Sequence, residues 1–185
     1  MTVYSACLFL HIVGALGLFA GIGLEQAGLA GLRQARTATQ LGEWVKLLTL
    51  LRRVEGPAAG LIVVTGLYLA VAGGRREAWV GLGLLGLLAM AGFGIGVTRA
   101  RVGSIARAMA SAGRESIPSS LVRRLDDPAL RMAASLRAAL GLGIVFLMAV
   151  KPGAPGAFAT LGVALLAGAV IAMRSPRHHD PVTEP

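Results

Sequence analysis

The chain has 185 residues, of which 55% are hydrophobic and 15% charged, with 26 glycines and a formal net charge of +9. Soluble domains average about 25% charged residues, so this composition excludes a disordered chain and disfavours an ordinary soluble enzyme. The single cysteine, Cys7, excludes an internal disulfide framework and a zinc or iron–sulfur site built from several cysteines. The class that remains is an integral membrane protein.

Five apolar segments are candidates to cross a bilayer, whose hydrocarbon core of about 30 Å takes about 20 helical residues. In chain order they are Tyr4–Leu24, Pro57–Gly73, Trp79–Thr98, Met132–Val150 and Gly153–Met173. Alternating apolar and polar stretches, which a membrane β-barrel needs, are almost lacking. The pattern therefore predicts an all-α polytopic membrane bundle with about five transmembrane helices.

We expect the first four helices to form one core bundle over residues 1–152. Its longer connections, 25–56 and 99–131, are rich in basic residues and are predicted to lie in the cytoplasm. A fifth transmembrane helix then covers 153–174, and a polar cytoplasmic tail covers 175–185.

Local signals place several helix ends. Thr39 is a predicted N-cap of a helix that runs into the second span with a bend at Gly56–Pro57. The third span is predicted to continue past Arg99 as a basic helix to Gly113. Asp127–Pro128 is a strong start for the fourth helix, because aspartate caps and proline suits the first helical position.

The basic residues set the expected orientation. The two long connections and the tail carry 14 Lys and Arg, the other connections carry three, and Arg137 lies inside a span. The positive-inside rule then predicts an external N-terminus and a cytoplasmic C-terminus in a bacterial inner membrane. Anionic lipid is the expected partner of the basic face. No basic motif with interleaved aromatics indicates nucleic-acid binding.

His11 is the only histidine inside a predicted span, about 12 Å of helix from Val3. Polar groups at such depth are candidates for function. Cys7 lies one turn earlier on the same face, and thiolate, imidazole and a methionine such as Met90 could together bind Cu(I).

Three other interpretations of His11 stay open. It could ligate the iron of a haem b, or carry a proton or substrate. It could also be a neutral histidine bonded to a neighbouring hydroxyl or carbonyl, beside a Cys7 that packs as a small hydrophobe.

A second candidate site is ionic. Glu25 ends the first span and Glu55 opens the second. Arg52 and Arg53 precede Glu55, and Arg137 lies about two turns into the fourth helix. The predicted orientation puts all of these residues at similar depth near the cytoplasmic face. A lone buried charge is strongly unfavourable, so Arg137 is expected to pair with Glu25 or Glu55. The cluster either pins helices together or forms a polar gate for a substrate or proton.

Several short motifs carry a family resemblance. They are Leu10–Ala15, Thr65–Leu67, Asp127–Ala129 and Met148–Pro152. Over residues 4–152 the chain resembles small bacterial membrane proteins of domain of unknown function family 2269, which look related to the copper-resistance D domain. The resemblance implies a four-helix bundle, metal handling, or a haem at the histidine of the first span. Of the histidine ligands that these activities imply, only His11 is present in this chain. The fifth span also departs from the four-helix pattern of the family.

No nucleophile elbow, phosphate-binding loop, dinucleotide fingerprint or metalloprotease motif occurs. We therefore expect a non-enzymatic membrane protein, either transport-like or an accessory subunit, with a homo-oligomer or a partner membrane subunit as its assembly. The alternative is a haem- or copper-binding redox or metal-handling protein centred on His11.

Overall fold

The computed structural model describes residues 2–74, 77–112, 121, 124–125 and 127–174, without the side chains of 111–112. The predicted helix end at Gly113, part of the connection 99–131 and the tail 175–185 lie outside these described residues.

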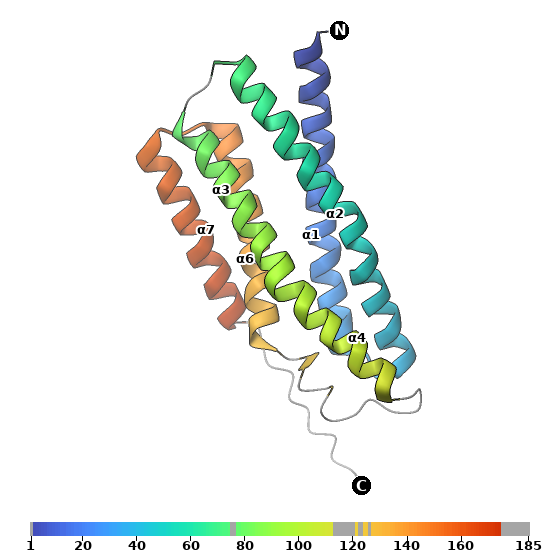
Figure 1. The fold of residues 1–185 in the computed structure, drawn as a ribbon. Coiled ribbons are helices and arrows are strands. Elements are labelled where there is room, and N and C mark those ends of the chain that lie inside the picture. Colours follow the sequence, from blue (N-terminus) through green and yellow to red (C-terminus); the bar gives the residue numbers. More distant parts are fainter. Residues whose placement is uncertain (1, 75–76, 113–120, 122–123, 126, 175–185) are drawn as a thin grey trace.

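Every described element is a helix (Figure 1). The elements are α1 (Val3–Gln34), α2 (Ala38–Ala72), α3 (Ala78–Phe93), the π-helix η1 (Gly94–Arg99), α4 (Ala100–Ala112), α6 (Pro128–Val150) and α7 (Ala154–Arg174). Five helices are long and apolar enough to span a membrane, with α3, η1 and α4 counting as one continuous helix. The predicted polytopic helical bundle is confirmed.

The start of α2 and the length of the first connection differ from the predictions, whereas the start of α6 agrees with them. The cap of α2 is Thr37 and not Thr39, because the Thr37 hydroxyl accepts from the Gln40 backbone N–H at 3.2 Å. Most of the predicted connection 25–56 is helix, with only a short turn between α1 and α2. The predicted start of α6 is confirmed, since the Asp127 side chain accepts from the Ala129 backbone N–H at 2.9 Å.

The helices form two groups that lie side by side (Figure 1). In the α1–α2 hairpin, glycines allow close approach: a Cβ on Gly28 would lie 2.7 Å from Leu48. In the other group α6 packs against both α3 and α7. A Cβ on Gly168 of α7 would lie 3.0 Å from the backbone of Leu136, so the fifth helix packs directly on the bundle. We call the interface between the two groups the seam.

Exposed large hydrophobic residues mark the lipid-facing belt. In α1 they end at Leu24, in α2 they begin at Leu50, and in the third span they end at Ile95. Beyond these positions α1 and α2 continue for about ten residues, or about 15 Å of helix, and the third span continues through α4 to Ala112. We call this part, residues 25–49 and 100–112, the helical extension. Its own leucine-rich core includes Leu32, Leu41, Val102 and Ile105.

Candidate functional site

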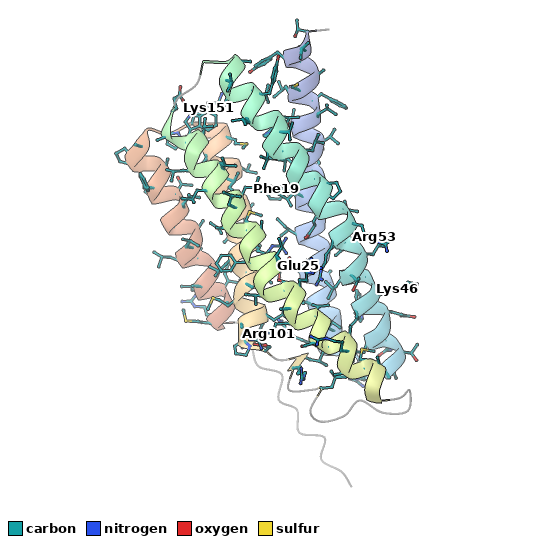
Figure 2. All side chains as sticks on the ribbon, viewed as in Figure 1. Phe19, Glu25, Lys46, Arg53, Arg101 and Lys151 are labelled. Carbon is teal, nitrogen blue, oxygen red and sulfur yellow. The ribbon has the colours of Figure 1, made fainter. Side chains whose placement is uncertain are left out.

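An ion cluster lies where the belt meets the helical extension. Arg137 of α6 donates to Glu25 of α1 through Nη1 and to Glu55 of α2 through Nη2, the latter at 3.0 Å. Only 3% of Glu25 and 5% of Arg137 are exposed, and Glu25 lies inside the bundle in Figure 2. The structure thus joins three helices from both groups through one guanidinium.

One arginine predicted for this cluster, Arg53, lies elsewhere. Its side chain is exposed and extends from the outer face of α2 (Figure 2). Arg52 is the arginine that shares the cluster's face, because positions three apart on a helix are neighbours and positions two apart are not. Arg52 is half-buried and interacts electrostatically with Glu25, Glu55 and Arg137. The three-residue spacing from Arg52 to Glu55 was the available sequence signal.

The cluster lines an inner cavity of about 260 Å³. Its charged lining residues are three arginines and two glutamates, an excess of one positive charge: Arg52, Arg99, Arg137, Glu25 and Glu55. Several buried atoms there have no hydrogen-bond partner, namely Glu25 Oε1, Glu55 Oε1, Arg52 Nη2 and Arg137 Nε. Buried polar groups that face a roomy polar cavity are commonly satisfied by water or a ligand.

The π-helix η1 forms one wall of this inner cavity. A Cβ on Gly94 would lie 3.2 Å from Cζ of Arg137, so glycine makes room for the guanidinium. Thr98, 5% exposed, lies beside Glu25, although its hydroxyl completes no hydrogen bond of standard geometry. π-Helical turns occur frequently at functional sites, and no pattern in Gly94–Arg99 predicted one.

An outer cavity of about 330 Å³ lies in the same seam, toward the N-terminal end of α1. Its lining is almost entirely apolar and comes from α1, α2, α3 and α6, including Phe19, Leu67, Trp79 and Ile144. His11 lines this cavity, while Tyr4 and Lys151 also belong to its lining.

His11 has a defined partner on α2. Its Nδ1 lies 3.0 Å from Oγ1 of Thr65, which in turn donates to the Leu61 carbonyl at 2.5 Å. A Cβ on Gly66 would lie 3.0 Å from Cε1 of His11, so the ring packs against a backbone position without a side chain. Of the sequence interpretations of His11, this geometry matches a histidine bonded to a neighbouring hydroxyl.

The predicted metal ligands are only partly together. Met90 lines the outer cavity with His11, but Cys7, partly buried one turn before His11, is not among the lining residues. Among the described residues no group of three His, Cys, Asp or Glu could hold a metal ion. The structure therefore does not bring Cys7, His11 and Met90 together around one cavity.

The two cavities share part of their walls. Leu18, Leu87 and Met90 line both, and all three are buried between the polar groups of the two cavities. They form an apolar partition, which we call the Leu18–Leu87–Met90 plug. Phe19, beside the plug, lies midway along the bundle in Figure 2, between Lys151 at one end and Glu25.

In comparisons with known proteins, no family model, curated protein or solved structure matches the chain. The resemblance to domain of unknown function family 2269 stays a prediction.

Proposed function

We propose that the protein is a small proton-translocating membrane protein whose path follows the seam. The observation that carries this proposal is the pair of cavities in one interface, which share the Leu18–Leu87–Met90 plug as part of their walls. A translocation path needs hydrated or polar sites on both sides of a barrier, and a narrow apolar constriction can act as a gate by excluding water.

The titratable groups support protons as the cargo. Glu25 and Glu55 line the inner cavity, and His11 lines the outer one. Chains of Asp, Glu and His are the usual proton relays of membrane proteins. Each glutamate gives one oxygen to Arg137 and keeps the other without a partner, so an acceptor remains open to the inner cavity.

The present conformation corresponds to a closed state of this path. The plug residues are at most 7% exposed, and no described polar side chain joins the two cavities through them. The π-helix η1 is the element best suited to move, because a shift from π to α geometry would rotate Thr98 relative to Glu25.

We further propose that the helical extension lies in the cytoplasm of a bacterium, with the N-terminus outside. The extension and its flanks carry most of the basic residues, and the positive-inside rule places such segments in the cytoplasm. Exposed side chains there, among them Lys46 and Arg101, are suited to anionic lipid headgroups (Figure 2). A reporter fused after Arg174 should report the cytoplasm, and one near Arg75 the outside.

The proposal is tested by proton flux into liposomes that hold the purified protein and a pH-sensitive dye, driven by a potassium diffusion potential. Glu25→Gln keeps the size of the side chain and removes its titration, while Glu55 still neutralises Arg137. We expect this substitution to lower the flux at least tenfold.

Glu43→Gln is the matched control, because Glu43 is an exposed glutamate of the helical extension. It should leave the flux unchanged. Equal flux from wild-type protein and empty liposomes would overturn the proposal and favour an accessory subunit.

A further inference from the structure

We propose that the outer cavity is a binding site for a lipid-soluble quinol, whose phenolic hydroxyl donates to Nε2 of His11. This inference goes beyond proton translocation and does not depend on it, since binding needs no gradient and no movement of the plug. Four observations carry it: the tautomer of His11, the apolar lining, the lateral access from lipid and the size of the cavity.

The tautomer of His11 follows from its hydrogen bonds. The Thr65 hydroxyl has one proton, and that proton lies between Oγ1 and the Leu61 carbonyl oxygen, which can only accept. Nδ1 of His11 must therefore carry the proton in its bond to Thr65. A neutral imidazole has a single N–H, so Nε2 keeps a free lone pair.

That lone pair is available to a ligand. The imidazole also interacts with the Ile62 backbone carbonyl, which can only accept a hydrogen bond. Within the part of the chain that the structure describes, no group donates to Nε2, and His11 belongs to the cavity lining. A hydrogen-bond acceptor in an apolar cavity selects ligands that carry an O–H or N–H donor, and an unpaired acceptor there is costly. A quinol offers such a donor, whereas the corresponding quinone offers only acceptors.

The rim of the cavity faces the bilayer. Leu8, Leu67 and Leu84 line the cavity, yet 41%, 62% and 43% of their surfaces are exposed within the lipid-facing belt. A ligand can thus enter sideways from the membrane without crossing the polar surface. This access selects an amphiphile dissolved in the bilayer over a water-soluble solute.

The cavity also suits an aromatic ring. Its volume of about 330 Å³ falls in the range of small-molecule sites, and Phe19 and Trp79 offer aromatic surfaces for packing. The described lining includes no carboxylate, so a cationic ligand would find no anionic partner there. One ring with one hydroxyl directed at His11 meets all these conditions.

The binding experiment uses full-length protein in lipid nanodiscs and follows the fluorescence of Trp79. The other tryptophan, Trp44, packs against Gly31 in the helical extension and is replaced by phenylalanine in every sample. The probes are a short-chain benzoquinol, its quinone and its dimethyl ether. Empty nanodiscs correct for partition into lipid, and Trp79→Phe, which leaves the chain without tryptophan, gives the background emission.

We expect the quinol to quench Trp79 at a midpoint at least tenfold lower than the quinone or the ether. His11→Phe, which keeps a ring and removes the acceptor, should abolish that difference. Thr65→Val removes the acceptor that fixes the proton on Nδ1, so it should bring the quinone midpoint close to that of the quinol.

Two results would overturn the assignment. One is equal midpoints for the three probes on the protein with native His11. The other is a quinol preference that survives His11→Phe, which would place the donor contact elsewhere. Because proton flux is not measured here, failure of this inference is distinguishable from failure of the proposed translocation.

Discussion

The inner and outer cavities lie in one seam and are similar in size, at about 260 and 330 Å³, yet their chemistry is opposite. The inner one is lined by five charged side chains, whereas the lining of the outer one is almost entirely apolar and includes His11, Tyr4 and Lys151. The difference in lining residues follows the depth of each cavity in the membrane. Charges gather at the edge of the lipid-facing belt, where each can be paired, whereas a site deeper in the belt keeps a neutral group.

The largest effect should come from removing the shared cation of the inner cavity. Arg137→Met leaves Glu25 and Glu55 buried beside each other without their guanidinium. Breaking a buried pair in this way costs roughly 3–5 kcal/mol. The measurement is thermal unfolding in detergent, followed by loss of helical circular dichroism. Arg53→Met, on the exposed face of α2, should change stability by less than about 0.5 kcal/mol.

A triple variant sharpens this test. Adding Glu25→Gln and Glu55→Gln to Arg137→Met removes the uncompensated charges and should recover much of the lost stability, because uncharged replacements of buried ion pairs are often nearly neutral. An Arg137→Met protein as stable as the wild type would show that the cluster is hydrated and unimportant for packing.

A smaller effect is expected from the glycine that gives Glu55 its space. A Cβ on Gly21 would lie 2.6 Å from Cγ of Glu55, so Gly21→Ala should push this carboxylate away from Arg137. Overpacking of this kind costs about 1–3 kcal/mol. On the same helix, Gly23 has nothing within 4 Å, and Gly23→Ala should raise stability by up to about 1 kcal/mol. Unfolding of the two variants side by side checks the difference, and equal shifts would contradict the close packing.

The smallest effect is expected in the outer cavity. Thr65→Val removes the hydrogen bond to His11 and should cost about 1 kcal/mol. Nitrogen NMR of labelled histidine reads the tautomer directly. The wild type should show a protonated Nδ1 and an unprotonated Nε2, and Thr65→Val should show both tautomers. A wild-type His11 protonated on Nε2 would contradict the hydrogen-bond geometry.

Much of the fold could be predicted from sequence, because long apolar runs and helix caps are local signals. Asp127–Pro128 predicted its helix start correctly, whereas the predicted cap Thr39 was wrong, because Thr37 is an equally good cap by residue type and makes the observed hydrogen bond. The joining of Glu25, Glu55 and Arg137 was also expected, because three buried charges at one depth have few alternatives.

The features that could not be predicted depend on how the helices pack against one another. Arg53 was expected in the cluster, although only its neighbour Arg52 shares the cluster's face, because the exact helical phase near Pro57 was not evident from the sequence. The π-helix at Gly94–Arg99 has no sequence pattern of its own. The partner of His11, Thr65, lies 54 positions away, so only the packing of α1 on α2 could identify it.

The central claim is that the two cavities are segments of one path that the plug closes. Shortening a side chain of the plug tests this claim most directly. Leu87→Ala removes a 7% exposed side chain of that partition, while Leu85→Ala makes the same change at a 58% exposed, lipid-facing position of the same helix. In the liposome assay we predict a several-fold higher proton flux for Leu87→Ala and wild-type flux for Leu85→Ala. Correctly folded Leu87→Ala protein with unchanged or lower flux would contradict the claim.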